Sequence, residues 1–163
     1  MTERANEMAL RGADLRVTRP RLAVMAALQR RPHAETSTII ELVREQHVDV
    51  SHQAVYDVLA ALTSAGLVRR IQPLGSVARY EARVGDNHHH VVCRRCGAVA
   101  DVDCAVGAAP CLDPLDDHAY AIDEAEVIYW GVCPDCQEPV RPVGAPGSTE
   151  PRTREESRVR RGR

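Results

Sequence analysis

The chain has 163 residues, of which 44% are hydrophobic and 3% aromatic, and its formal net charge is −2. This length allows one or two small domains whose cores are built from aliphatic side chains. No apolar run approaches the roughly 18 residues of a membrane span, and the polar, charged first 16 residues lack the pattern of a signal or transit peptide. We therefore expect a cytoplasmic protein with no membrane partner.

The charges are distributed unevenly along the chain. Residues 1–82 carry 11 arginines and 9 acidic residues, whereas residues 83–136 carry 3 arginines and 10 acidic residues. The chain has no lysine, so every fixed positive side chain is a guanidinium, which suits bidentate contact with phosphate. This asymmetry fits a nucleic-acid-binding part joined to a metal-binding part, although ordinary solvated surfaces would also explain it.

Three helices are expected in the first half of the chain, at residues 18–30, 36–46 and 51–65. Thr18, Thr36 and Ser51 are suitable N-caps, and Pro20 is tolerated in a first turn. Apolar residues recur at three- and four-residue spacing within each segment, and Gly66 supplies the last stop signal.

Two short strands, at residues 68–72 and 77–81, follow these helices and are joined by a turn. Three helices and a hairpin form a winged helix-turn-helix, in which residues 51–65 would be the recognition helix. The predicted DNA contacts are Arg19, Ser51, Gln53, Tyr56, Arg69 and Arg70. Arg79 would also reach phosphates from the wing. The alternative is a three-helix domain that packs against a partner protein.

Two Cys-x-x-Cys pairs, Cys93/Cys96 and Cys133/Cys136, provide four thiolates, the complete ligand set of a closed tetrahedral zinc site. Gly97 fits the tight turn after the first pair. Such a zinc ion would be structural. The alternative is a redox-active dithiol, which needs only one pair and normally opens a helix of a βαβ unit that is not predicted here.

The run His88-His89-His90 precedes the first cysteine pair. In an extended segment His88 and His90 lie on one face and His89 on the other. With a third histidine and carboxylates, two such imidazoles would form an N/O site for Fe²⁺, Mn²⁺ or Zn²⁺. The alternative is a polar surface strand.

The rest of the chain gives weaker signals. Short strands are expected near residues 91–93, 98–103 and 126–132. Cys104 and Cys111 have no metal-ligand spacing and are either buried small residues or possible redox thiols. The predicted organisation is α+β, with a winged-helix domain at 1–82, a hinge at 83–87, a small α/β metal-binding domain at 88–136, and a disordered arginine-rich tail at 137–163.

Several motifs together resemble the ferric uptake regulator (Fur) family, and their details are most similar to its FurA/CatR branch. The motifs are Val17-Thr18-Arg19-Pro20-Arg21, Gln53-Ala54-Val55-Tyr56, Ala65-Gly66-Leu67-Val68, Arg79-Tyr80-Glu81, and His88-His89-His90 followed by Cys93-x-x-Cys96-Gly97. The resemblance implies a homodimeric repressor that binds a palindromic operator in double-stranded DNA. It also implies one structural Zn²⁺ per subunit and a regulatory Fe²⁺ or Mn²⁺. The regulatory ligands implied by the family motif are His33, Glu81, His88, His90 and Asp101.

Asp101 resembles the peroxide-sensing members of the family, whereas Glu81 resembles the iron sensors. The FurA/CatR branch implies a peroxide-responsive repressor of a catalase-peroxidase gene and of its own gene, with His33 and His88 as oxidation targets. An iron- or zinc-responsive uptake regulator is the alternative within the family. A metal-binding thiol oxidoreductase is the alternative from another class, but no nucleophile and general-base pair supports an enzyme.

Overall fold

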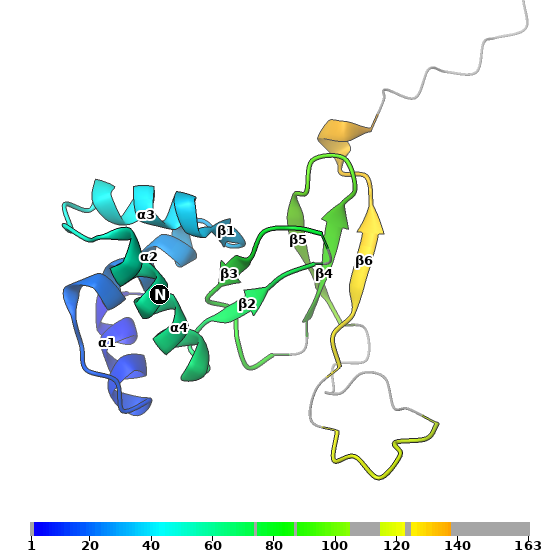
Figure 1. Cartoon of the computed structure of the whole chain (residues 1–163), viewed down its shortest axis with the longest axis horizontal. Coiled ribbons are helices and arrows are strands. Elements are labelled where there is room, and N and C mark those ends of the chain that lie inside the picture. Colours follow the sequence, from blue (N-terminus) through cyan, green and yellow to red (C-terminus); the bar gives the residue numbers. More distant parts are fainter. Residues whose placement is uncertain (1, 74, 87, 105–114, 123–124, 138–163) are drawn as a thin grey trace, which may run out of the picture.

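The computed structural model describes residues 2–73, 75–86, 88–104, 115–122 and 125–137. A helical part, the strands of a small wing, and a second sheet follow one another in space as they do in the sequence (Figure 1). The first part contains α1 (Glu3–Gly12), α2 (Arg19–Arg30), β1 (Ala34–Glu35), α3 (Thr36–Glu45), α4 (His52–Ser64), β2 (Arg69–Ile71) and β3 (Arg79–Glu81). The second contains β4 (His88–Cys93), β5 (Val99–Asp103), β6 (Ile128–Gly131) and the short 3-10 helix η1 (Pro134–Cys136). The predicted α+β fold class is confirmed, whereas the predicted domain limits stay predictions and residues 138–163 of the predicted tail lie outside the described residues.

The main hydrophobic core lies among the helices. Its fully buried side chains include Val24 and Leu28 of α2, Ile39 of α3, and Leu59 and Leu62 of α4. These residues recur at the spacing that places them on one face of each helix, and burying them removes apolar surface from water. The core therefore fixes α4, the predicted recognition helix, relative to α2 and α3.

The helix boundaries agree with the sequence except at two places. Ser51 caps α4 as predicted, since its Oγ accepts a hydrogen bond from the Ala54 N–H at 3.1 Å. Thr36 is the first residue of α3 instead of its cap, because strand β1 carries extended backbone up to Glu35. Helix α1 was not predicted, and its buried Asn6 accepts a hydrogen bond from the Gln29 amide at 2.7 Å.

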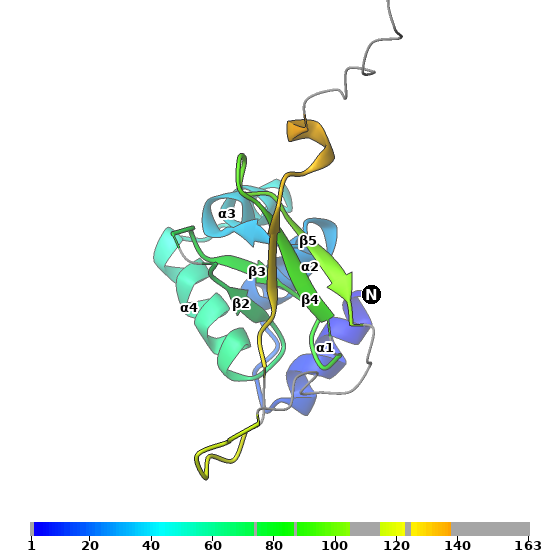
Figure 2. The ribbon, with the colours of Figure 1, turned by 90° about the vertical axis from the view of Figure 1, so that its right-hand side faces the viewer.

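The strands form two three-stranded sheets, with orders β1-β3-β2 and β5-β4-β6. The β2–β3 hairpin predicted for the wing is confirmed as an antiparallel pair. In the second sheet β4 is central, antiparallel to β5 and parallel to β6, and Figure 2 shows this sheet in front of the wing and helices. Strand β4 begins at His88, so the histidine run is part of the strand.

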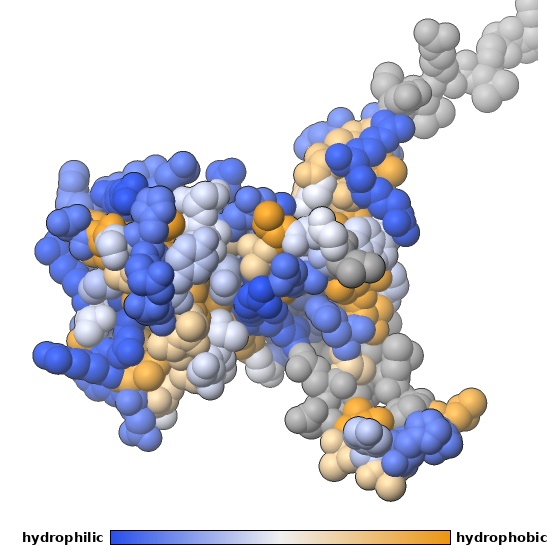
Figure 3. All heavy atoms as spheres, in the orientation of Figure 1, coloured by the Kyte–Doolittle hydropathy of each residue, from blue (hydrophilic) through white to orange (hydrophobic). Residues whose placement is uncertain are grey.

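The second sheet is covered less completely than the helices. Tyr129 and Trp130 of β6 are 48% and 39% exposed, whereas the surface over the helices is largely hydrophilic (Figure 3). Exposed apolar side chains of this kind commonly mark a contact surface. Among the described residues, none of the helices has the length and apolarity needed to cross a membrane.

Candidate metal centres

The four cysteines of the two Cys-x-x-Cys pairs converge at one end of the second sheet. Strands β4 and β6 run parallel, with Cys93 opposite Gly131, so the segments that leave their ends emerge at the same edge. The first pair turns back through Gly97, whose φ of +71° is readily adopted only by glycine. The second pair spans η1, in which the Cys136 N–H donates to the Cys133 carbonyl at 3.0 Å.

The sulfur atoms are close enough to share one ion. All four Sγ atoms lie within 4.8 Å of one another, and the Cys96 and Cys133 sulfurs are 3.6 Å apart. A tetrahedral zinc with Zn–S bonds of about 2.3 Å needs sulfurs roughly 3.8 Å apart. The four-cysteine cluster therefore suits structural zinc, as predicted.

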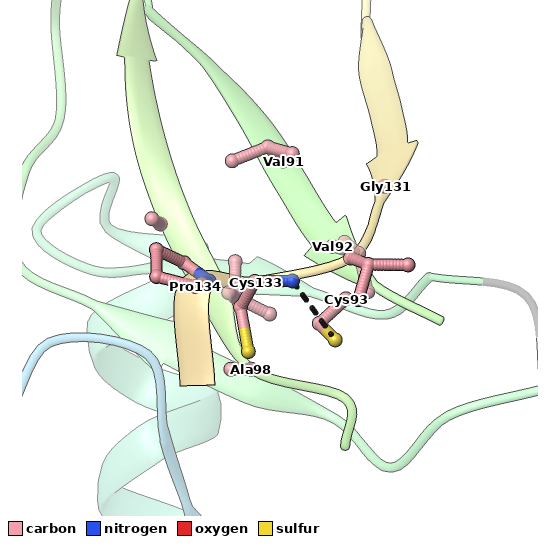
Figure 4. A pocket seen from close by; sticks show the side chains of 10 residues that line it. Val91, Val92, Cys93, Ala98, Gly131, Cys133 and Pro134 are labelled. Atoms are coloured by element: carbon pink, nitrogen blue, oxygen red, sulfur yellow. Dashed lines mark hydrogen bonds between the residues drawn. The ribbon is translucent and has the colours of Figure 1, made fainter. Parts of the chain in front are cut away.

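The backbone near this cluster already favours a thiolate. Figure 4 shows Cys93 beside Cys133, whose N–H donates to the Cys93 sulfur at 3.3 Å. This bond, together with those from the Cys96 and Arg95 backbones, lowers the pKa of Cys93 to about 6. The neighbouring thiols of Cys133 and Cys96 raise the pKa of Cys136 to about 12. The four sulfurs thus cannot all be thiolates without a counter-charge. A bound cation would supply that charge, because it stabilises all four sulfurs as thiolates.

A second cluster lies where the wing meets the second sheet. It combines His33, which precedes β1, with Glu81 at the end of β3, His90 on β4 and Asp101 on β5. One ligand atom from each lies within 4.8 Å of those of the other three. The His33 Nε2 is 3.0 Å from Glu81 Oε2 and 2.7 Å from Asp101 Oδ1. Two imidazoles and two carboxylates suit a divalent transition metal.

Sheet register and backbone conformation explain this convergence. His90 and Asp101 are direct partners in the β4–β5 pair, so their side chains lie on the same face. His33 has a φ of +57°, an uncommon conformation for a residue other than glycine. Its carbonyl accepts a hydrogen bond from Arg79 Nη1 at 3.1 Å, which holds this turn in place.

His88, the fifth predicted ligand, lies beside this cluster. Its Nε2 is 3.1 Å from Glu81 Oε1 but 4.0 Å from Asp101 Oδ1, and the compact four-residue group does not include it. Its Nδ1 faces Asp86 Oδ1 at 2.7 Å. The structure thus brings four of the five predicted residues into one group. His88 lies next to this group and contacts Glu81, one of its members. All three histidines of the run are buried, so the surface-strand alternative is wrong.

The charges in the second cluster depend on one another. Burial alone would raise the pKa of Glu81, but hydrogen bonds to His33 and His90 and the nearby histidine charges lower it to about 2. Burial also opposes the charged form of His33, yet the Glu81 hydrogen bond and the negative charge of Asp101 outweigh it and raise the pKa of His33. Without a metal, the Glu81 carboxylate and the His33 imidazole therefore each favour the charged form of the other.

The predicted DNA-contacting residues lie on and near α4 and the wing. Tyr56 is 51% exposed on α4, and Gln53 donates to Asp57 Oδ1 at 2.8 Å. Arg19, Ser51 and Arg70 are exposed, and Arg69 is half-buried. Arg79, which was also predicted to reach phosphates, is 18% exposed and pairs with Glu35 at 2.9 Å, its direct partner in the β1–β3 pair. A guanidinium held in this way has little surface left for a phosphate.

Among the described residues, Cys104 and His89 belong to neither cluster. Cys104 is half-buried just after β5, and Cys111 lies outside the described residues. His89 points to the other side of β4, where its ring contacts Tyr129 with centroids 6.2 Å apart. The sequence interpretation missed two hinge residues: Arg83, which contacts Asp101 of the second cluster, and Asp86, which contacts His88 beside it. Their three-residue spacing next to the histidine run was the available signal.

Comparison with known proteins identifies the family. Residues 12–109 match the Ferric uptake regulator family. The FurA transcriptional regulator of Mycobacterium tuberculosis is 70% identical over 127 residues, which cover 78% of this chain and 86% of that protein. Ferric uptake regulation protein 1 of Mycolicibacterium fortuitum is 72% identical over 121 residues, covering 74% and 75%. The chain belongs to the ferric uptake regulator family. It is a FurA-type transcriptional regulator, not an enzyme, and as a regulator of this family it binds DNA.

Solved structures agree on the fold of this family. The Helicobacter pylori ferric uptake regulator Fur has a TM-score of 0.64 at 19% identity, covering 86% of this chain and 97% of that one. The Campylobacter jejuni peroxide stress regulator has a TM-score of 0.59 at 22% identity, covering 83% and 99%. The predicted fold, a helical DNA-binding domain followed by an α/β domain with a four-cysteine cluster, is therefore confirmed.

Replacing Cys96 with Ser should abolish tight zinc binding and lower the midpoint of thermal unfolding, because three thiolates cannot close the tetrahedral site and zinc binding contributes to folding. Zinc per chain, measured by plasma mass spectrometry, and circular dichroism melting would test this. Cys104→Ser is the matched control and should retain zinc. A Cys96→Ser protein with full zinc and an unchanged melting curve would contradict the four-cysteine assignment.

The coupling between Glu81 and His33 should make stability depend on pH when only the cysteine cluster is metal-loaded. Because the folded pKa of His33 is raised above 6.5, its contribution is fully present below pH 6.5 and is lost as the pH rises through the folded value. The contribution of Glu81 is lost only as the pH falls towards about 2. The groups facing His33 are Glu81, His90 and Asp101.

Urea unfolding of the parent and of His33→Gln between pH 6 and 9 would measure this effect. The free energy of unfolding of the parent should exceed that of the variant by an amount that decreases with rising pH. A difference that grows with pH would show that His33 is buried as the neutral form instead.

Proposed function

We propose that this chain is a metal-dependent repressor that acts as a homodimer on a palindromic operator and responds to hydrogen peroxide. The observation that carries the proposal is the composition of the second cluster: His33 and Glu81 come from the winged-helix part, His90 and Asp101 from the second sheet. A metal that bonds all four groups stabilises only the arrangement in which the two parts are held together. It thereby shifts the population towards that arrangement.

The two clusters would hold different metals. Four thiolates with no open position suit Zn²⁺ as a structural ion, whereas mixed imidazole and carboxylate ligands suit exchangeable Fe²⁺ or Mn²⁺. In this assignment His33, Glu81, His90 and Asp101 bind the regulatory ion, and His88 completes the set through its position next to Glu81. The cysteine cluster would stay loaded while the regulatory site gains and loses its ion.

The DNA-binding surface would be the N-terminal end of α4 together with the wing. Gln53 and Tyr56 are exposed there, and side chains at this end of a recognition helix reach base edges in the major groove. To bond a base, the Gln53 amide would have to leave Asp57. Arg19, Arg69 and Arg70 would contact phosphates. Dimer formation is supported by the exposed Tyr129 and Trp130 of β6.

Peroxide sensing is supported by Asp101, the residue in which the chain resembles the peroxide-sensing members of the family. Bound Fe²⁺ would supply one-electron chemistry with peroxide that Mn²⁺ lacks. The protein's part is to hold the His33 or His88 ring at the site, where a ring carbon gains one oxygen atom of hydrogen peroxide while the other leaves as water. An oxidised imidazole is a poor ligand, so the regulatory metal and the DNA would be released.

Fluorescence anisotropy on DNA from the chain's own promoter would test this function. With zinc in the cysteine cluster, the Fe²⁺- and Mn²⁺-loaded proteins should both bind. A small dose of hydrogen peroxide should release only the Fe²⁺ form, with a gain of one oxygen atom on His33 or His88 by peptide mass spectrometry. A catalase-peroxidase promoter would be the second DNA to test.

Other results would favour the alternatives. If the Fe²⁺ form stays bound after peroxide, the chain is an iron-responsive regulator and the argument from Asp101 fails. If Zn²⁺ alone at the second cluster controls DNA binding, the chain is a zinc-responsive regulator. If peroxide releases both loaded forms alike, the cysteine thiols are the sensor. Cys104 would then be the first described residue to replace.

Replacing Tyr56 with Ala should weaken operator binding by about 1–3 kcal/mol, the usual value of a lost base contact. Binding isotherms at fixed salt would measure this. Tyr120→Ala, which removes another exposed tyrosine ring, from the segment after residue 114, is the control and should bind normally. If the two variants bind equally well, α4 does not present Tyr56 to DNA.

A further inference from the structure

Arg83 lies in the hinge between β3 and β4 and contacts three carboxylates at once. Its Nε donates to Asp86 Oδ2 at 2.6 Å, its Nη1 to Asp101 Oδ2 at 3.3 Å, and its Nη2 to Asp103 Oδ1 at 2.7 Å. All four side chains are partly exposed, so each ion pair contributes little to stability by itself. Two of the contacts, however, bear on the second cluster: Asp101 is a member of it, and Asp86 contacts His88 beside it.

In the contact with Asp101, the two carboxylate oxygens face different groups. Oδ1 faces the cluster, 2.7 Å from His33 Nε2 and 3.8 Å from His90 Nε2. Oδ2 accepts the hydrogen bond from Arg83 instead. A carboxylate can bind a metal through one oxygen or both. With Oδ2 occupied in this way, Asp101 offers a single donor atom.

The second contact reaches His88 through Asp86. Asp86 Oδ2 accepts from Arg83, while its Oδ1 faces the His88 Nδ1 at 2.7 Å. This arrangement directs the other ring nitrogen, Nε2, towards Glu81 Oε1 at 3.1 Å. Metal-binding histidines commonly have such a carboxylate on the nitrogen that does not bind the metal, and it fixes the orientation of the ring.

We propose that Arg83 is a positioning residue for the regulatory metal: its guanidinium restricts Asp101 to one donor oxygen and, through Asp86, orients His88 towards the cluster. This inference rests on the proposed function of the cluster as a regulatory metal site. A rigid planar guanidinium suits the task because its donors diverge in fixed directions, and here they meet carboxylates from the hinge and from β5.

The sign of the effect separates positioning from simple electrostatics. Arg83 carries a positive charge close to Asp101, so removing it makes the site more negative. If charge alone mattered, Arg83→Ala would bind a divalent cation more tightly. If Arg83 positions the ligands, the same variant binds the cation more weakly, because Asp101 and His88 must be ordered when the ion arrives.

The test is Mn²⁺ affinity of the full-length, zinc-loaded chain, measured from the electron paramagnetic resonance signal of free Mn²⁺. Arg83→Ala and Asp86→Ala should each raise the dissociation constant about 10- to 100-fold, the usual loss for an outer contact of a metal ligand. The double variant should raise the dissociation constant by less than the product of the two single increases, since both residues act partly through His88. Arg83→Lys keeps the positive charge but not the branched guanidinium. Its dissociation constant should lie between those of Arg83→Ala and the parent.

Two controls are available in the same chain. Arg11→Ala removes an arginine that pairs with Glu7 on α1 and should leave Mn²⁺ affinity unchanged. His90→Ala removes a ligand and should abolish tight binding. Circular dichroism would confirm that each variant is folded, and zinc content would confirm that the cysteine cluster is loaded.

Visible spectra of the Co²⁺-loaded proteins provide a readout that a general loss of stability would not change. Freeing Asp101 Oδ2 lets a second oxygen reach the ion, so the Arg83→Ala bands should be weaker than those of the parent, as expected for a higher coordination number. Unchanged or tighter Mn²⁺ binding with an unchanged spectrum overturns the positioning role while the regulatory site stands. If the parent itself does not bind Mn²⁺, the proposed function fails and this inference fails with it.

Discussion

The carboxylate of Glu81 is the interaction on which the arrangement of this protein depends. It is fully buried, and an isolated buried carboxylate would be strongly unfavourable. His33 contacts one of its oxygens, His88 contacts the other, and His90 lies 3.4 Å from it. These partners come from the loop before β1 and from β4, so one charge connects the winged-helix part to the second sheet. A metal ion at this point would replace contacts that already hold the two parts together.

Strand β4 connects the two metal clusters. His88 and His90 lie near its beginning and Cys93 at its end, so one strand contributes to both sites. Pairing with β5 brings Asp101 opposite His90, and parallel pairing with β6 brings the second cysteine pair to the first. An ion held by the four cysteines would fix the end of β4 against β6. It would thereby stabilise the strand that carries His88 and His90 to the second cluster.

Local sequence signals predicted most elements of the first part, because periodic apolar residues, Ser51 and Gly66 act within a few positions of themselves. These local signals failed where contacts between distant segments determine the structure. Helix α1 was missed, although its Leu10 is fully buried against the other helices. The ion pair of Arg79 with Glu35 was not foreseen, because these residues are far apart in the sequence and become neighbours only through the β1–β3 register.

The sequence by itself determined the four-cysteine cluster, since two Cys-x-x-Cys pairs permit few other uses and each pair is a local turn. It also indicated the histidine run and, through resemblance, its partners His33, Glu81 and Asp101. Only the tertiary structure decided how these side chains meet: four residues form one compact group, His88 contacts Glu81 beside it, and Arg83 donates a hydrogen bond to Asp101. The reason is physical. Ligand distances depend on strand register and on contacts between segments far apart in the chain, which no local pattern specifies.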